Sequence, residues 1–150
     1  MRGNMVLNQD FKEFIESLND NNVRYLIIGG YAVAFHGHPR YTKDLDVWIW
    51  ISQENATNMV KALDQFGFAS LGLKAEDFLE PDTVIQLGYP PNRIDILLGL
   101  KGMNFESSYS SRIEVEMDQL KLNFIDLANL KKSKKFAGRK QDLADLDNLE

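Results

Sequence analysis

Three aspartates have the type and spacing of residues that hold a metal ion. Asp44 and Asp46 lie two residues apart in an apolar segment that reads as a strand, so their side chains project from the same face. Two carboxylates this close repel each other, and a divalent cation relieves that repulsion by sharing their oxygens. The alternative is a pair of solvated acids at a strand end, which is common for so short a motif.

The third aspartate, Asp95, lies in the otherwise apolar run 93–98, where an unpaired charge would be costly. Its partner could be Arg93 on the same strand face, or Arg24 from a neighbouring strand. If its strand instead pairs with the strand of Asp44 and Asp46, three carboxylates form an all-oxygen site for one or two Mg²⁺ or Mn²⁺ ions.

A glycine pair, Gly29-Gly30, ends the apolar segment 23–28 and precedes a short helical pattern. Backbone N–H groups at such a turn can approach a bound phosphate, and glycine permits the close approach. An ordinary strand-to-helix turn is the alternative. The order of glycine turn, loop, paired aspartates and later lone aspartate is more specific than any one of these features.

Other polar and aromatic residues near these motifs have simpler interpretations. His36 and His38 flank Gly37 beside a proline, a spacing more typical of an exposed loop than of a metal site. Trp48 and Trp50 share one strand face and are expected to cover the sheet or fill the core.

The elements that must position these residues alternate between helical and strand patterns, which predicts an α/β (α+β) fold with a mixed central sheet flanked by helices. Helices are expected at about 8–18 after an Asn8 cap, at 31–35, and from Ser52 to a stop at Gly67. A weaker helix is expected at 74–79. Strands are predicted at 23–28, 44–51, 83–87, 93–98, 113–117 and 120–124, the last four as two hairpins. Two short helices, 125–135 and 140–149, close the chain.

Bulk composition narrows the function classes. The chain has 150 residues, a size usual for one domain, and it contains no cysteine, which excludes disulfides and thiolate metal sites. Its start lacks the apolar core of a signal peptide and no apolar run could span a bilayer, so we expect a cytoplasmic protein without membrane contact. The net charge is −5, yet residues 131–140 hold six basic residues and no acid. That segment could meet a polyanion or could be a solvated helix face.

These motifs resemble the nucleotidyltransferase superfamily that includes polymerase-beta-like and antibiotic-modifying enzymes. The matching pattern is Ile28-Gly29-Gly30, thirteen residues, then Asp44-Leu45-Asp46-Val47. More narrowly, the segment IIGGYAVAFHGHPRYTKDLDVWI and the closing KKFAGRKQDLADL look like small bacterial nucleotidyltransferases grouped near the AbiEii-type toxins. The resemblance covers about residues 25–146.

The resemblance implies a role for each matching residue. Asp44, Asp46 and Asp95 would hold metal, and Asp95 would also help to activate the acceptor hydroxyl. The residues implied to contact the nucleoside triphosphate are Gly29, Gly30, Arg40, Thr42, Lys134, Arg139 and Asp142. Lys131, Lys132 and Lys135 compete with Lys134 for the phosphate-facing position. Tyr31 stands where the family has a small residue, and we expect it to pack rather than to line the site.

The activity so implied is metal-dependent transfer of a nucleoside monophosphate group from a nucleoside triphosphate such as ATP to an acceptor hydroxyl. The acceptor could be RNA such as tRNA, a protein or a small molecule, and a partner or antitoxin chain could complete the site. Larger superfamily members carry an additional acceptor-binding domain for which this sequence shows no counterpart. Two alternatives stay open: a catalytically inactive module of the same fold that binds nucleotide or a partner, and a D-x-D glycosyltransferase, for whose usual fold the chain is short.

Overall fold

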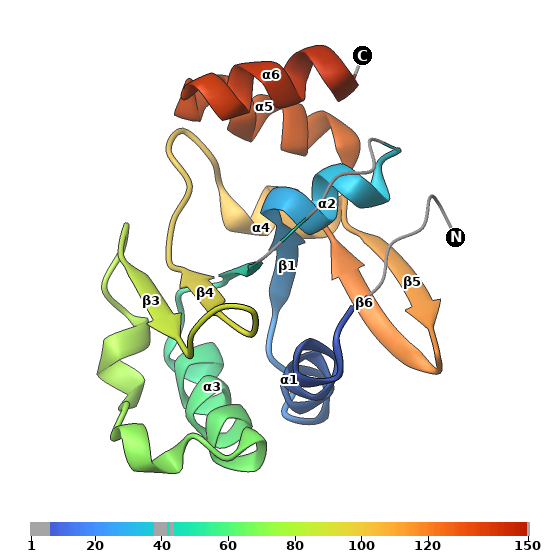
Figure 1. The fold of residues 1–150 in the computed structure, drawn as a ribbon. Helices are drawn as coiled ribbons and strands as arrows, with labels where there is room; N and C mark the ends of the chain where they lie inside the picture. Colours follow the sequence, from blue (N-terminus) through green and yellow to red (C-terminus); the bar gives the residue numbers. More distant parts are fainter. Residues whose placement is uncertain (1–6, 38–41, 43, 150) are drawn as a thin grey trace.

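A computed structural model describes residues 7–37, 42 and 44–149 (Figure 1). The helices are α1 (Gln9–Asp20), α2 (Gly29–Phe35), α3 (Gln53–Phe66), α4 (Phe105–Ser110), α5 (Leu127–Ala137) and α6 (Lys140–Leu149), with 3₁₀ turns η1 (Ala69–Leu71) and η2 (Ala75–Phe78). The strands are β1 (Tyr25–Ile28), β2 (Leu45–Ile49), β3 (Val84–Leu87), β4 (Ile94–Leu97), β5 (Ile113–Met117) and β6 (Leu120–Phe124).

The six strands form one mixed sheet in the order β3-β4-β2-β1-β6-β5. Two pairs, β1 with β6 and β2 with β4, are parallel. The hairpins β3-β4 and β5-β6 are antiparallel, as the sequence predicted, and so is β1 with β2. The predicted α/β class with a mixed sheet and two closing helices is therefore confirmed.

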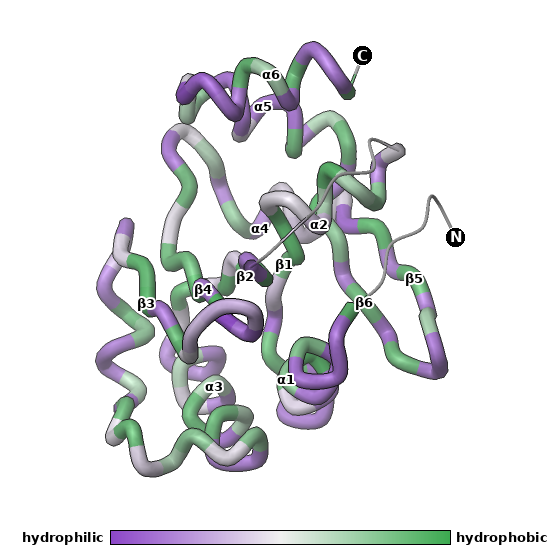
Figure 2. The backbone as a smooth tube through the Cα atoms, in the orientation of Figure 1, coloured by the Kyte–Doolittle hydropathy of each residue, from purple (hydrophilic) through white to green (hydrophobic). Residues whose placement is uncertain are grey.

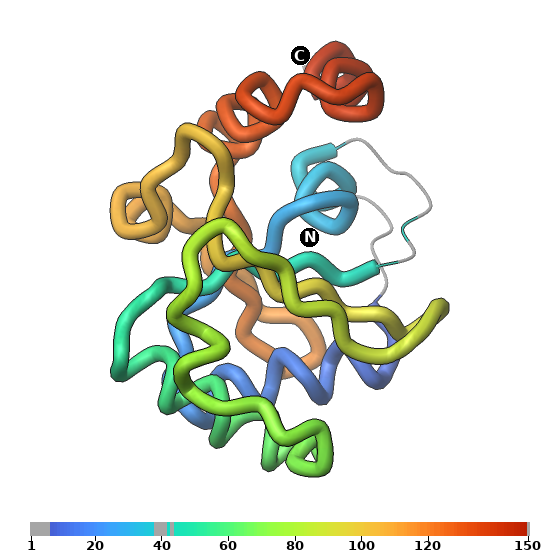
Figure 3. The backbone as a smooth tube through the Cα atoms, turned by 90° about the vertical axis from the view of Figure 1, so that its left-hand side faces the viewer, coloured from blue at the N-terminus to red at the C-terminus, as the bar shows by residue number. Residues whose placement is uncertain are grey.

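Helices lie on both sides of the sheet. Figures 1 and 3 show α1 and α3 on one side, and α2 with the α5–α6 pair on the other. Alternation along β2 sends Leu45 and Val47, both fully buried, to the side opposite Asp44 and Asp46. Figure 2 shows the hydropathy of the elements: the central strands are largely hydrophobic, whereas α5 and α6 are mostly hydrophilic. The main core thus lies between the sheet and α1 and α3, and the polar site faces the other way.

Local signals place the helix ends. The Asn8 side chain accepts a hydrogen bond from the Phe11 N–H at 2.8 Å, and Ser52 Oγ accepts one from the Asn55 N–H at 3.0 Å. Gly67, with φ of +104°, ends α3 in the left-handed conformation. All three were predicted from sequence.

The structure corrects several boundaries. Helix α2 begins at Gly29 rather than at residue 31, and the weak helix expected at 74–79 is the shorter 3₁₀ turn η2. Most strands are one to three residues shorter at their ends than their hydrophobic patterns suggested. Helix α4 was not predicted, because its short sequence FESSYS carries only one apolar pair at helical spacing, Phe105 and Tyr109. Asn104 caps it by accepting from the Ser107 N–H at 2.9 Å.

In the part of the chain that the structure describes, no helix is both long enough and apolar enough to cross a bilayer.

Candidate active site

Strand pairing brings the three predicted aspartates together. In the parallel pair of β2 with β4, Asp46 and Asp95 are register partners. Asp44 directly precedes β2 and Arg93 directly precedes β4, and the Leu45 N–H donates to the Arg93 carbonyl at 3.2 Å. Because residues two apart share a strand face, the side chains of these four residues gather on one side of two adjacent strands.

Arg93 is the ion-pair partner of Asp95. Its Nε and Nη2 donate to Oδ1 and Oδ2 of Asp95 at 3.0 and 2.9 Å, a bidentate arrangement. Its Nε also lies 3.7 Å from Oδ2 of Asp44. Arg24, the other partner considered from sequence, instead lies over the rings of Trp50 and Tyr109.

The remaining carboxylates are poorly compensated. Burial, together with the negative charges of Asp95 and Asp44, raises the pKa of Asp46 from 3.8 to about 7. Oδ1 of Asp44 is buried and has no hydrogen-bond partner among the described residues. One guanidinium beside three carboxylates leaves an excess of negative charge and free acceptor oxygens, the donor set that hard divalent cations take.

The side chains are nevertheless not arranged as a finished metal site. Among the described residues, no group of three or more histidine or acidic side chains is positioned to hold a metal ion as it stands. In this conformation Arg93 serves as the cation of the cluster. The oxygen chemistry fits a divalent metal, but binding one requires these side chains to rearrange.

Gly29 lies directly against the aspartates. It adopts φ of +68°, and a Cβ at this position would collide with Oδ2 of Asp46 and lie 3.1 Å from its Cβ and Cγ. Only glycine satisfies both the backbone conformation and the close approach. Gly30 follows in the first turn of α2 and is buried. The glycine turn and the paired aspartates, separate in the sequence, thus form one packed unit.

A second charged cluster joins α5 to α6. Lys134 Nζ lies 3.0 Å from Oδ2 of Asp145 and 3.3 Å from Oδ1 of Asp142, and Arg139 Nε lies 2.7 Å from Oδ2 of Asp142. The lysine is 8% exposed and the two acids are at most 1% exposed. Burial alone would raise the pKa of Asp142, but the Arg139 hydrogen bond and the Lys134 charge outweigh it and lower that pKa.

This geometry separates Lys134 from its three neighbouring lysines. Burial is the largest cause of the raised Asp46 pKa, and the Lys134 charge opposes that rise. Asp142 is the main cause of the raised Arg139 pKa, and Asp46 adds to it, so both cations interact electrostatically with Asp46. Three other lysines line a separate hollow of about 510 Å³ with residues of α6: Lys131, Lys132 and Lys135. Asp145 was not singled out from sequence; its spacing three residues after Asp142, on the same helix face, was the available signal.

The other residues considered from sequence have structural roles or lie outside the described residues. Arg40 and His38 fall outside them, and Thr42 is half-buried. His36 Nε2 lies 2.8 Å from the Ile125 carbonyl oxygen and so donates to it, which ties α2 to the end of β6. Tyr31 is buried and packs edge-on against Phe11 at 5.8 Å, which confirms the packing interpretation.

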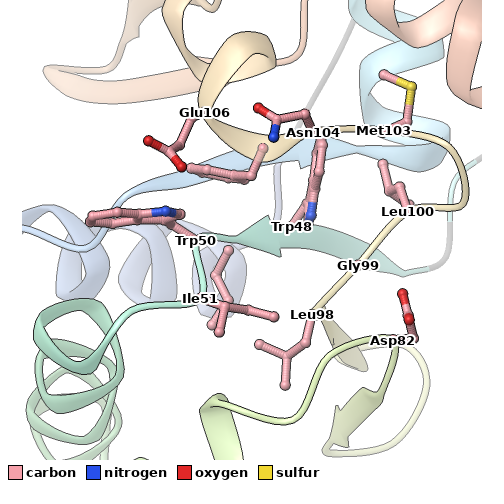
Figure 4. A pocket seen from close by; sticks show the side chains of 12 residues that line it. Trp48, Trp50, Ile51, Asp82, Leu98, Gly99, Leu100, Met103, Asn104 and Glu106 are labelled. Atoms are coloured by element: carbon pink, nitrogen blue, oxygen red, sulfur yellow. The ribbon is translucent and has the colours of Figure 1, made fainter.

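The two tryptophans lie further along β2. Trp48 is buried and meets Phe105 of α4 edge-on at 5.1 Å, which confirms its expected role as sheet cover. Trp50 is half-buried beneath Arg24. Both help to line a hollow of about 270 Å³ whose rim includes Asp82, Asn104 and Glu106 (Figure 4).

Comparisons with known proteins identify the fold and the family of the chain. No curated protein matches the chain. Among solved structures, it is similar to an antigenic nucleotidyltransferase-like protein from Paracoccidioides brasiliensis, with a TM-score of 0.56 and 14% identity over 95% of this chain and 77% of that one. At this identity the likeness shows the fold alone. The model of a family described as nucleotidyltransferase of unknown function (DUF6036) matches residues 5–150, and the chain therefore belongs to that family.

Proposed function

We propose that this protein is an active nucleotidyltransferase that moves a nucleoside monophosphate group from a nucleoside triphosphate to an acceptor hydroxyl. The acceptor oxygen attacks the α-phosphorus, the bond from that phosphorus to the β-bridging oxygen breaks, and pyrophosphate leaves in line. Mg²⁺ or Mn²⁺, when bound, would supply Lewis acidity that lowers the pKa of the acceptor hydroxyl and offsets the charge on the leaving pyrophosphate.

The observation that carries this proposal is the register of Asp46 with Asp95 on adjacent parallel strands, with Asp44 beside them. A fold that needed only structural ion pairs would have little reason to gather three carboxylates around one arginine. We assign metal binding to Asp44, Asp46 and Asp95, and proton acceptance from the acceptor hydroxyl to Asp95. The close approach of the Gly29 backbone to Asp46 supports placing the phosphates of the substrate next to the metal ligands.

Cations around the aspartates would hold the triphosphate. Lys134 and Arg139 both pair with Asp142, and both interact electrostatically with Asp46. Gly29 and Gly30 would offer backbone N–H groups to phosphate oxygens. Arg40 and Thr42 precede the paired aspartates and complete the proposed set of contacts.

The acceptor and the cellular setting belong to the same proposal. The substrate would be ATP or another nucleoside triphosphate, and the acceptor would be an RNA such as tRNA, a protein or a small molecule. We propose a bacterial cytoplasmic setting and a relation to AbiEii-type toxin–antitoxin proteins, with a partner chain supplying acceptor surface. The support for this narrower setting is the sequence resemblance.

One observation favours a second candidate, an inactive module of the same fold that binds nucleotide or a partner. The bidentate pair of Arg93 with Asp95 satisfies that carboxylate without any metal. Such a module would bind nucleotide without releasing pyrophosphate.

Calorimetric titration with non-hydrolysable nucleoside triphosphates and Mg²⁺ tests the site directly. Wild type should bind one nucleotide preferentially, and Asp44→Asn/Asp46→Asn should lose that binding. Glu114→Gln/Glu116→Gln is the matched control, because it removes two acids with the same spacing from strand β5. Equal binding by wild type and the aspartate variant would contradict the metal site.

Turnover distinguishes the two candidates. Pyrophosphate release is measured with the preferred triphosphate and a panel of RNA, protein and small-molecule acceptors. We expect release that depends on Mg²⁺ and falls at least about a hundredfold in Asp46→Asn. Tight binding without release from any acceptor would support the inactive module.

A further inference from the structure

The position of Arg93 affects how a divalent cation could bind at the proposed site. Its guanidinium takes both oxygens of Asp95, at 3.0 and 2.9 Å, and lies 3.7 Å from Asp44. These two residues belong to the three carboxylates that the proposed function assigns to metal. A divalent cation and the guanidinium therefore compete for the same oxygen atoms and for the same negative charge.

The Arg93 side chain can leave the aspartate cluster while its backbone stays in place. Its backbone is fixed, since its carbonyl accepts from the Leu45 N–H and continues the ladder between β2 and β4. Its side chain is about one third exposed, whereas that of Asp95 is 13% exposed. The turn before it, Gly88 to Asn92, is exposed throughout. The guanidinium can therefore swing toward solvent by side-chain rotation alone, without moving the strand.

We propose that Arg93 is an internal counter-ion that keeps divalent metal out of the aspartate cluster until nucleotide arrives. This inference rests on the proposed function. Metal alone must displace the guanidinium into solvent and leave it without an anionic partner. Metal that arrives with a nucleotide brings phosphates to which the displaced guanidinium can turn. Arg93 then makes the binding of metal and nucleotide mutually dependent, and that dependence must be equal in both directions.

Mn²⁺ binding measured by the spin-resonance signal of the free ion tests the inference without any turnover. Without nucleotide, Arg93→Gln should bind Mn²⁺ at least about tenfold more tightly than wild type. With a saturating non-hydrolysable triphosphate, the affinity of wild type should rise by a larger factor than that of Arg93→Gln. Arg93→Lys, which keeps the charge but cannot span both oxygens of Asp95, should lie between them.

Arg112→Gln is the matched control. Arg112 directly precedes strand β5 and forms an ion pair at 2.8 Å with Glu114, two residues further along the chain, the same spacing as between Arg93 and Asp95. The control removes the same charge away from the cluster and should leave the Mn²⁺ affinity within about twofold. Circular dichroism checks that each variant is folded.

Two results would overturn the inference. The first leaves the proposed function standing, and the second overturns it as well. If Asp44→Asn/Asp46→Asn loses Mn²⁺ binding while Arg93→Gln and Arg93→Lys bind it as wild type does, the metal site stands and only the role of Arg93 fails. If the aspartate variant binds Mn²⁺ as tightly as wild type does, the cluster is not the metal site and the proposed function fails with it.

Discussion

Two clusters of partly or fully buried charge among the described residues differ in their balance of positive and negative groups. Between α5 and α6, the carboxylates of Asp142 and Asp145 meet the cations of Lys134 and Arg139. On β2 and β4, the described residues include three carboxylates and one guanidinium, that of Arg93, which pairs with Asp95 and lies near Asp44. The pKa shifts run in opposite directions: that of Asp142 is lowered, and that of Asp46 is raised to about 7.

The difference in charge balance predicts opposite contributions of the two clusters to the stability of the fold. In a balanced cluster each charge is satisfied within the protein, so the cluster fixes two helices against each other. In an unbalanced cluster the folded state is less favourable than it could be until a cation arrives. Substitutions in the two clusters should therefore change stability with opposite signs.

The largest effect is expected at Lys134. Lys134→Met should lower the free energy of unfolding by about 3 to 5 kcal/mol, because it leaves Asp145 buried without its cation. Chemical denaturation at pH 7 measures this loss. Adding Asp145→Leu to the same chain should recover part of it, since an apolar pair replaces the ion pair. Lys132→Met, at an exposed position, is the control, and a loss there equal to that at Lys134 would contradict the assigned role of the cluster.

The next largest effect is expected for Gly29→Ala, which should lower the free energy of unfolding by about 2 to 4 kcal/mol. Two causes add: the positive φ, and the collision of the new Cβ with Asp46. Gly72→Ala separates them, because Gly72 has φ of +69° but no atom within 4 Å of its Cβ position. Thermal and chemical denaturation of both variants gives the difference. Equal losses of stability at the two glycines would show that the collision with Asp46 does not contribute to the effect.

Asp46→Asn should change stability in the opposite direction. Because the folded state raises the pKa of Asp46 from 3.8 to about 7, it binds the proton more tightly than the unfolded chain does. The wild-type free energy of unfolding should therefore fall as pH rises from about 4 through 7, in the presence of chelator. At pH 8 the asparagine variant should be more stable than wild type by roughly 2 to 4 kcal/mol, and at pH 4 nearly equal to it.

Asp142→Asn provides the contrasting pH profile. The lowered pKa of Asp142 means that its carboxylate stabilises the fold above its ordinary pKa of 3.8 and that this contribution is lost as the solution becomes more acidic. The variant should be less stable than wild type at pH 8. If both asparagine variants changed stability in the same direction at pH 8, the distinction between the clusters would fail.

The smallest effect is expected at Arg139. Its side chain is 77% exposed, so solvent screens its pair with Asp142. Arg139→Ala should cost at most about 1 kcal/mol of stability. If Arg139 contacts the triphosphate, the same variant should weaken nucleotide binding by about tenfold, measured by calorimetry. A large stability loss with unchanged nucleotide binding would make Arg139 a structural residue only.

Much of the fold was predictable because its signals are local. The caps at Asn8 and Ser52, the stop at Gly67 and the two hairpins follow from neighbouring residues and the period of apolar side chains. Helix α4 was missed because one apolar pair at helical spacing, Phe105 and Tyr109, is a weak signal in six residues; its cap and the packing of Phe105 on Trp48 hold it.

The candidate site was predictable in its members but not in its contacts. Alternation along the strands identified Asp44, Asp46 and Asp95, whereas the choice between Arg93 and Arg24 as the partner of Asp95 depends on strand order. Hydropathy also misleads on α6, where Asp145 is fully buried and Leu143 is 49% exposed. That exchange follows from the cation on the neighbouring helix, which no local pattern in α6 encodes.

Because β2 pairs with β4, the alignment of the site aspartates depends on how the hydrophobic core fixes these two strands. Ile94 and Ile96, both buried, lie on the opposite strand face from Asp95. A slip of one residue between the strands would expose both isoleucines and turn the Asp95 carboxylate toward the core. Burial of the isoleucines therefore fixes the register that aligns the aspartates. Core substitutions that loosen β4 should therefore disturb ligand geometry even where no polar residue has changed.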